Sequence, residues 1–323
     1  MAYTFGVIGV GGIGGYYGAK LQHAGEEVHF LLRNDFRHVC RYGLRVQSVT
    51  GDFVLPQVNA YQQSQHMPPC DVVLVALKAT HNDLIPDLVA PLLKPDTTVV
   101  LLQNGLGAEP QLSQALPGIT VVGGLCFICT TRIAPGHIHH LDYGSIVLAE
   151  YLPGYQPCAV SPRVAAIAEI FQAAGIPTQV MTDLLLCRWQ KLVWNIPFNA
   201  LAVLLSAQTD AMMRDPELVA LIQEVMQEVQ QTAAAYGREI PNTFVEGRLE
   251  HTRRMQPYTP STQVDFAAGR ELEVEAIWGN PWRAAQQKGI PTPHMAMLYR
   301  QLRFLNAHNL RASTNAVTSP SRV

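Results

Sequence analysis

The segment that decides the fold is residues 5–33, FGVIGVGGIGGYYGAKLQHAGEEVHFLLR, close to the N-terminus. It starts with a short apolar run, Phe5–Gly9, that predicts a strand, followed by a helix over residues 12–24 that ends at Gly25. A second apolar run, Val28–Leu32, is typical of a strand that is buried on both faces of a parallel sheet. The three elements predict one βαβ unit.

A glycine pattern, GxGxxG, occupies Gly9–Gly14, where the first strand ends and the helix begins, and it includes Gly12 and Ile13. Gly9 permits the tight turn, Gly11 lets backbone N–H groups approach a pyrophosphate, and Gly14 lets the helix pack close to the strand. The helix N-terminus adds partial positive charge. The turn therefore predicts a dinucleotide site, and both flanking elements disfavour the alternative of an ordinary glycine-rich turn.

The residue that follows the second strand indicates which dinucleotide binds. An acid there accepts hydrogen bonds from the ribose hydroxyls of NAD, whereas an arginine pairs with the 2′-phosphate of NADP. This chain has Arg33 at that point, which favours NADP(H). Asp35, two residues later, is a competing ribose ligand, and a solvated loop cation is the alternative interpretation of Arg33.

The rest of the chain predicts an α/β protein of two domains, residues 1–182 and residues 183–323. In the first, apolar runs alternate with helical segments. They predict strands at Val72–Leu77, Thr98–Leu102, Val121–Cys126 and Ser145–Ala149, a hairpin from Leu44–Val49 and Phe53–Leu55, and a helix at 161–174. In the second, apolar residues recur every three or four positions, which predicts an all-helical domain with one helix from Asp215 to Gly237. The small polar tail after residue 311 is expected to fray.

Composition narrows the function classes. The 323 residues carry 23 Lys and Arg against 25 Asp and Glu, a net charge of −2, so no global field attracts nucleic acid. The apolar runs fall short of the roughly 18–20 residues that span a bilayer, so we expect no membrane segment. The six cysteines lack the spacing of a disulfide framework, which indicates reduced thiols and a cytoplasmic location. The sequence leaves a homodimer open.

A polar stripe is the first candidate for chemistry. Lys191, Asn195 and Asn199 recur at every fourth position of an apolar helical stretch, so they share one face. Polar groups in so apolar a helix need internal hydrogen bonds or a ligand, and the residues alone leave both interpretations open. A second candidate begins at Ser261 and continues through Glu271, Glu273 and Glu275, among which spacing does not choose.

Two further motifs are discounted. Cys126 and Cys129 fit CxxC but lie on a predicted strand, so a structural role is favoured over a redox site. His137, His139 and His140 lack an acid or cysteine at ligand spacing, so solvated strand-end histidines are favoured over a metal site. We therefore predict no metal.

Five separated motifs together resemble the ketopantoate reductase (2-dehydropantoate 2-reductase) family, and the resemblance covers nearly the whole chain. The motifs occur in the family's order: the GxGxxG turn, Leu77-Lys78-Ala79, Gln103-Asn104-Gly105-Leu106-Gly107, the Lys191/Asn195/Asn199 stripe, and the segment with Ser261, Asp265, Gly269-Arg270 and Glu273. The resemblance implies an N-terminal Rossmann-type, doubly wound sheet joined to a C-terminal all-helical domain, with the active site between them. It implies reduction of a small 2-oxo acid by NADPH.

The resemblance also implies roles for matching residues. Lys191 corresponds to the family's catalytic lysine, and Glu273 to the glutamate that holds the substrate's hydroxyl. The implied substrate-binding residues are Asn195, Asn199 and Ser261, while Asn104 bridges cofactor and substrate. Lys78 is implied to lie near the cofactor, and Arg33 matches the arginine that binds the 2′-phosphate.

The sequence departs from the family around these groups. Where the family commonly has Thr-Glu-Ile-Asp followed by Asn-Gly, this chain has Leu272-Glu273-Val274-Glu275 and then Trp278-Gly279. Ser-Ser-Met becomes Ser261-Thr262-Gln263. Three functions follow as hypotheses: a reductase of 2-dehydropantoate in pantothenate synthesis, a related reductase of another 2-oxo or hydroxy acid, and a non-catalytic NADP(H) sensor.

Overall fold

The structure is a computed structural model that describes residues 3–318. These residues form two compact units. The first consists of the chain up to Gln103 together with Gly107–Cys187, and the second of Asn104–Leu106 together with the chain from Arg188 onward. Three residues between two segments of the first unit are thus packed in the second.

The first unit alternates strands and helices. Its strands are β1 (Thr4–Ile8), β2 (Glu27–Leu31), β3 (Leu44–Ser48), β4 (Phe53–Leu55), β5 (Asn59–Tyr61), β6 (Val72–Val75), β7 (Thr98–Leu101), β8 (Thr120–Ala134), β9 (His137–Glu150) and β10 (Thr178–Met181). Its α-helices are α1 (Gly12–His23), α2 (Phe36–Tyr42), α3 (Ile85–Val89), α4 (Ala108–Ala115) and α5 (Pro162–Ala173).

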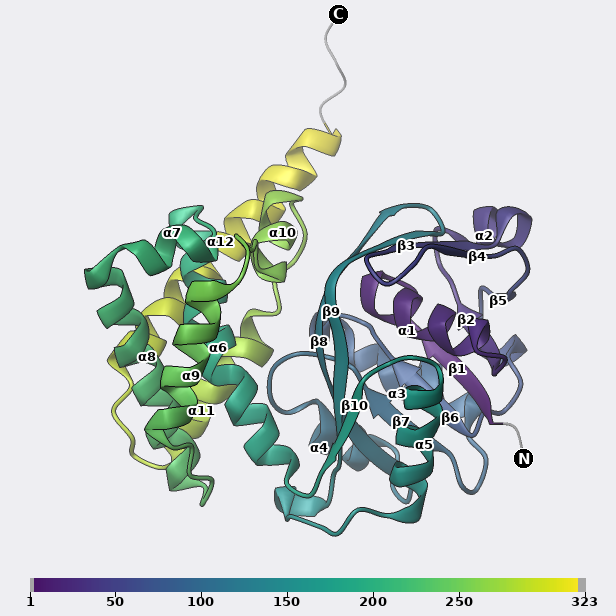
Figure 1. The fold of residues 1–323 in the computed structure, drawn as a ribbon, viewed down its shortest axis with the longest axis horizontal. Coiled ribbons are helices and arrows are strands. Elements are labelled where there is room, and N and C mark those ends of the chain that lie inside the picture. Colours follow the sequence, from purple (N-terminus) through teal and green to yellow (C-terminus); the bar gives the residue numbers. More distant parts are fainter. Residues whose placement is uncertain (1–2, 319–323) are drawn as a thin grey trace, which may run out of the picture. The chain divides into compact units, whose positions relative to one another are not determined.

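One sheet contains all these strands, in the order β4-β3-β9-β8-β7-β6-β1-β2-β5, with β10 paired to β9 (Figure 1). From β8 to β5 every neighbouring pair is parallel, as the βαβ pattern predicts. Almost all residues of the central strands β1, β6 and β7 are buried, because helices cover both faces of the sheet. Tyr17 of α1 and Phe171 of α5 pack on one face, and Val89 of α3 and Leu112 of α4 on the other. The predicted doubly wound sheet is confirmed.

The structure extends the sheet beyond the prediction. β8 and β9 are much longer than the expected strands Val121–Cys126 and Ser145–Ala149, and they form one long antiparallel pair (Figure 1). The sheet is therefore mixed. β5 and β10 are additional strands of only three and four residues, too short to produce a periodic signal. The hairpin of β3 and β4 is confirmed.

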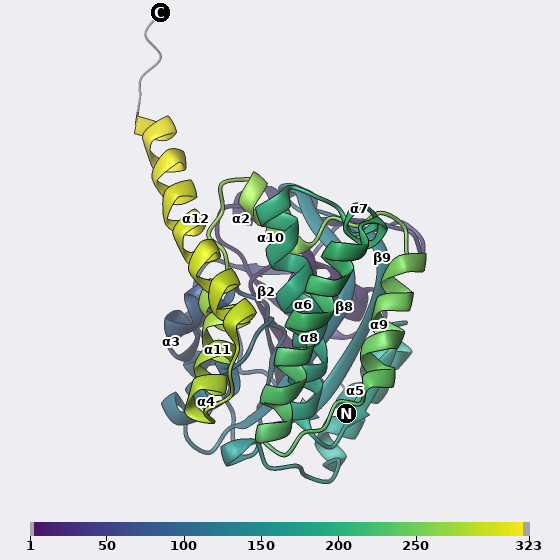
Figure 2. The ribbon, with the colours of Figure 1, turned by 90° about the vertical axis from the view of Figure 1, so that its left-hand side faces the viewer.

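The described part of the second unit is built from helices, as predicted. They are α6 (Leu184–Leu205, which begins in the first unit), α7 (Thr209–Arg214), α8 (Pro216–Ala235), α9 (Asn242–Arg254), α10 (Ser261–Ala267), a π-helix (Glu275–Gly279), α11 (Asn280–Gln287) and α12 (Pro293–Thr318). Figure 2 shows α6, α8 and α9 together, with α12 beside them.

The start of α8 and the end of α12 can be compared with what the sequence predicts for them. Asp215 caps α8 as expected, since its carboxylate accepts hydrogen bonds from the N–H groups of Glu217 and Leu218. α12 continues to Thr318, so the first part of the tail that was expected to fray is assigned to a helix. The remainder of the predicted tail, residues 319–323, lies outside the described residues.

The glycine turn gives a first prediction, because a Cβ at Gly14 would lie 2.2 Å from the carbonyl oxygen of Gly9 and 2.8 Å from Cβ of Ala76. We expect Gly14→Ala to push α1 away from β1 and to lower the free energy of unfolding by about 1–3 kcal/mol or more. Urea unfolding followed by circular dichroism measures the change. An unchanged midpoint would contradict the close packing of α1.

Candidate active site

The first part of the candidate site is the glycine turn in the first unit. Gly9 has a φ of +93°, and a Cβ there would meet the backbone of Ala76 and Leu77 at 2.9 Å. Gly11 is the N-cap of α1, where no side chain accepts a hydrogen bond from the first-turn N–H groups and no acidic residue lies in that turn. A Cβ at Gly11 would meet nothing within 4 Å. Open space before uncapped N–H groups suits a phosphate group.

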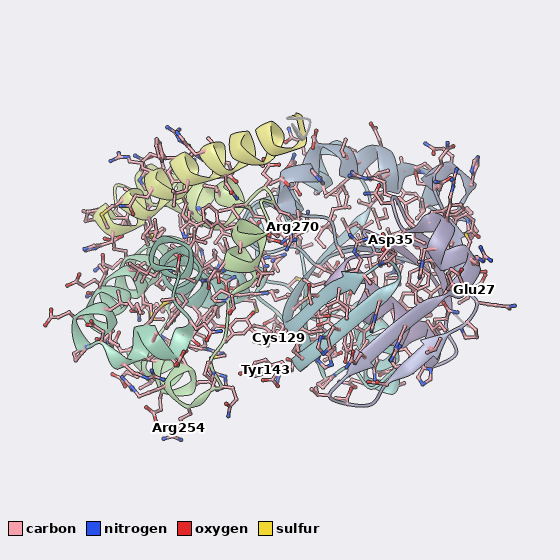
Figure 3. The ribbon with its side chains drawn as sticks, turned by 90° about the horizontal axis from the view of Figure 1, so that it is seen from above. Glu27, Asp35, Cys129, Tyr143, Arg254 and Arg270 are labelled. Carbon is pink, nitrogen blue, oxygen red and sulfur yellow. The ribbon has the colours of Figure 1, made fainter. Side chains whose placement is uncertain are left out.

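The structure separates the two residues that compete for the ribose end of a dinucleotide. Arg33 is exposed just beyond β2, whereas Asp35 is 5% exposed. Figure 3 labels Asp35 in the first unit. One carboxylate oxygen of Asp35 pairs with Arg132, and the other accepts the backbone N–H of Gly136 at 3.2 Å. Because both oxygens of Asp35 are engaged inside the first unit, Asp35 is a poor ribose ligand. Arg33 is exposed and stays the predicted ligand of the 2′-phosphate.

Two further residues follow neighbouring parallel strands. Lys78 comes after β6 and is half-buried at the start of a 3-10 helix, Ala79–Leu84. Asn104 comes after β7 and is half-buried. In doubly wound sheets, ligands bind beyond the carboxyl ends of the strands. Asn104 belongs to the second unit, where most of the remaining candidate residues lie.

The polar stripe lies on α6 as predicted. Asn195 and Asn199 are 7% and 3% exposed, and Lys191 is half-buried one turn earlier. The helix continues through Pro197 to Leu205, so proline does not end it. Burying an amide is costly unless the amide is hydrogen-bonded. The stability of the helical unit therefore depends on the hydrogen bonds that Asn195 and Asn199 make.

Burial distinguishes Glu273 from its neighbours, which spacing could not do. Glu273 is 7% exposed, whereas Glu271 and Glu275 are both exposed. The backbone carbonyl of Glu273 accepts the N–H of Ile277 at 3.1 Å, so Glu273 lies at the entrance to the π-helix. π-helical turns occur frequently at functional sites.

Ser261 and Trp278 complete the second-unit residues singled out by the sequence. Ser261 is exposed at the start of α10, and that helix ends with an ion pair between Asp265 and Arg270 at 2.8 Å. Trp278, which departs from the family pattern, is 1% exposed and donates its indole N–H to the carbonyl oxygen of Ile196 at 2.9 Å. Trp278 therefore ties the π-helix to the middle of α6, a role that its sequence position did not reveal.

The discounted histidines need one correction. His140 is fully buried rather than solvated, and its Nδ1 shares a hydrogen bond with the hydroxyl of Ser48 at 2.8 Å. Burial lowers the pKa of His140. His137 and His139 are partly buried on the same strand, β9. Within residues 3–318, no group of three or more His, Cys, Asp or Glu side chains could hold a metal ion.

Comparisons with known proteins identify the family. The family described as "Ketopantoate reductase PanE/ApbA" matches residues 5–153, and "Ketopantoate reductase PanE/ApbA C terminal" matches residues 183–306. The chain belongs to the ketopantoate reductase family. A 2-dehydropantoate 2-reductase from Nostoc sp. is 49% identical over 94% of this chain and 96% of its own length.

Solved ketopantoate reductases share the fold. A 2-dehydropantoate 2-reductase from Geobacter metallireducens GS-15 has a TM-score of 0.88 at 38% identity, covering 93% of this chain and 99% of that one. One from Methylococcus capsulatus has a TM-score of 0.86 at 35% identity, covering 95% and 97%. Ketopantoate reductases use NADPH, in agreement with the cofactor that Arg33 indicates. Among the described helices, none combines the length and apolar character that a membrane crossing requires.

Gly11 gives a prediction that separates binding from stability. Since a Cβ at Gly11 has no neighbour within 4 Å, we expect Gly11→Ala to lower the free energy of unfolding by no more than about 1 kcal/mol, the cost of alanine at an N-cap. The methyl group would occupy the approach to the N–H groups of α1, so NADPH affinity should fall about tenfold or more. Fluorescence titration with NADPH and thermal unfolding measure the two effects. Unchanged affinity would place the phosphates elsewhere.

Proposed function

We propose that this chain reduces 2-dehydropantoate to (R)-pantoate with NADPH, a step of pantothenate biosynthesis. The observation that carries the proposal is the set of buried polar side chains in the helical unit, Asn195, Asn199 and Glu273, in a chain 49% identical to a 2-dehydropantoate 2-reductase. Binding a dinucleotide alone requires none of these groups, so they argue for a catalyst over an NADP(H) sensor.

Lys191 and Glu273 are the proposed catalytic pair. NADPH, when bound, supplies the hydride that reduces the ketone carbon. Negative charge then grows on the carbonyl oxygen, and the ammonium group of Lys191 stabilises it and donates a proton. The carboxylate of Glu273 accepts a hydrogen bond from the hydroxyl group of the substrate. Its burial strengthens that bond, because the site has a lower effective dielectric than water.

Neutral polar groups are proposed to orient the substrate. The amides of Asn195 and Asn199 and the hydroxyl of Ser261 can donate to the carboxylate and hydroxyl oxygens of a 2-oxo acid. They carry no net charge, so they position an anion without competing with Lys191 for the developing charge. The stripe on α6 presents Lys191 and both amides from one rigid helix, which limits the entropy lost on binding.

The cofactor-binding residues form the rest of the proposal. Gly9, Gly11, Gly12, Ile13 and Gly14 would hold the pyrophosphate with the N-terminus of α1, and Arg33 would pair with the 2′-phosphate. Lys78 would lie near the cofactor, and Asn104 would contact both cofactor and substrate. We also propose a cytoplasmic location, which suits the six free cysteines, and assembly as a homodimer.

The decisive experiment measures NADPH oxidation at 340 nm with 2-dehydropantoate, beside a panel of other 2-oxo acids. We expect saturable turnover with a strong preference for 2-dehydropantoate. Lys191→Ala should lower kcat by about 10²–10⁴-fold while NADPH affinity is retained. Lys288→Ala, an exposed lysine of the same unit that stacks on Tyr236, is the matched control. Preferred turnover of another 2-oxo acid would identify the related reductase instead.

The preference for NADPH is tested at Arg33. We expect Arg33→Asp to raise the KM for NADPH about 10–100-fold, because a charge-assisted contact is lost and a like charge faces the phosphate. The KM for NADH should change little. Arg37→Asp, an exposed arginine of α2, makes the same change of charge four residues away. Equal losses for both cofactors in Arg33→Asp would refute the assignment.

A further inference from the structure

The loop that carries Asn104 is held at its backbone by the π-helix and the start of α11. The N–H of Leu106 donates to the carbonyl oxygen of Ala276 at 2.9 Å. The carbonyl oxygen of Leu106 accepts from the side-chain amide of Asn280 at 2.6 Å. Both backbone polar groups of Leu106 are therefore occupied, two residues after Asn104.

Gly105 brings this loop into direct contact with the backbone of the π-helix. Its φ is +89°, and a Cβ there would lie 2.4 Å from the carbonyl oxygen and 2.7 Å from the Cβ of Ala276. Because no side chain fits at this point, the loop rests on the π-helix without an intervening layer. Movement of Ala276 or Asn280 would therefore move the backbone next to Asn104.

The amide of Asn280 is itself fixed by a chain of side chains. Its oxygen accepts from Nη2 of Arg283 at 2.7 Å, and the same nitrogen donates to Oε2 of Glu275 at 2.7 Å. The hydroxyl of Tyr299 donates to Oε1 of Glu275 at 2.8 Å. Since Arg283 only donates, it leaves the Nδ2 group of Asn280 to face the carbonyl of Leu106.

The π-helix connects this clamp to Glu273. Ile277 donates its N–H to the carbonyl of Glu273, and Ala276, the preceding residue, accepts from Leu106. One helical turn thus supports the backbone of the proposed active-site glutamate and the backbone beside Asn104.

We propose that Asn280 is a positioning residue for hydride transfer, which acts by holding the Leu106 carbonyl and thereby placing Asn104 against cofactor and substrate. The inference rests on the proposed function, which gives Asn104 its role. Small displacements of positioning groups are costly in enzymes, where a shift of about 1 Å can reduce the rate about 10²-fold.

The test is a double-mutant cycle in kcat/KM with Asn280→Ala, Asn104→Ala and the double variant. We expect each single variant to lose about 10–100-fold and the double variant to lose no more than about twofold beyond Asn104→Ala, because both changes act on one group. Gln230→Ala is the matched control. Gln230 also donates its amide to a backbone carbonyl, that of Ile240 at 2.9 Å, within the same unit. It should retain wild-type kcat/KM.

The variant Asn280→Asp distinguishes two roles of Asn280, which are to hold the Leu106 carbonyl and to accept a hydrogen bond from Arg283. Aspartate keeps an acceptor for Arg283 but cannot donate to the Leu106 carbonyl, so we expect it to be as impaired as Asn280→Ala. Rescue of kcat/KM by Asn280→Asp would overturn the inference, as would multiplicative losses in the cycle. Because Asn280→Asp retains the contact with Arg283, it keeps the test available where Asn280→Ala fails to fold.

NADPH affinity distinguishes failure of the inference from failure of the proposed function. In calorimetric titrations we expect Asn280→Ala and Asn104→Ala each to weaken NADPH about three- to tenfold, with no further loss in the double variant. This readout needs no 2-oxo acid. A wild-type enzyme inactive on 2-dehydropantoate would refute the proposed substrate, whereas additive losses of NADPH affinity would refute the role of Asn280.

Discussion

At Gly14 in the first unit and at Gly105 in the second, backbone approaches backbone so closely that no side chain fits between the two segments. In the first unit a Cβ on Gly14 would lie 2.2 Å from the carbonyl oxygen of Gly9, and in the second a Cβ on Gly105 would lie 2.4 Å from that of Ala276. The first contact seats α1 against β1 and leaves its uncapped N-terminus beside open space at Gly11. The second seats the Asn104 loop on the π-helix that follows Glu273. The turn proposed to bind phosphate and the loop proposed to contact the substrate therefore both depend on glycine.

In the second unit, neutral and charged polar side chains differ in how deeply they are buried. Burying an amide costs little once it is hydrogen-bonded, whereas burying an unpaired charge is expensive. Asn195 and Asn199 are accordingly almost fully buried, while the cation of the stripe, Lys191, is only half-buried. Glu273 is a carboxylate that is 7% exposed and lies between two exposed glutamates. A carboxylate in that position suits the proposed role of Glu273, which is to accept a hydrogen bond from the hydroxyl group of the substrate.

Local patterns predicted what local physics determines. The βαβ unit, the cap at Asp215 and the shared face of Lys191, Asn195 and Asn199 depend on residues within a few positions of one another, and the structure contains all three. The extension of β8 beyond Cys126 was missed because its later residues are stabilised by pairing with β9 rather than by an apolar pattern. Spacing alone could not single out Glu273, since its burial is a tertiary property. Asn280 gave no signal, because its partner Leu106 lies 174 positions away.

Trp278 and Asn280 lie where this sequence departs from the family pattern, and each makes a hydrogen bond to a segment that carries polar residues of the candidate site. The family's Asn-Gly is Trp278-Gly279 here, a departure that lies five residues after Glu273 in the sequence. The indole is 1% exposed and is engaged with the carbonyl of Ile196 on α6, between Asn195 and Asn199. An asparagine is present two positions later, at Asn280, where it holds the loop of Asn104. Trp278 therefore ties the π-helix to the part of α6 that carries the two amides, while Asn280 ties the start of α11 to the loop of Asn104.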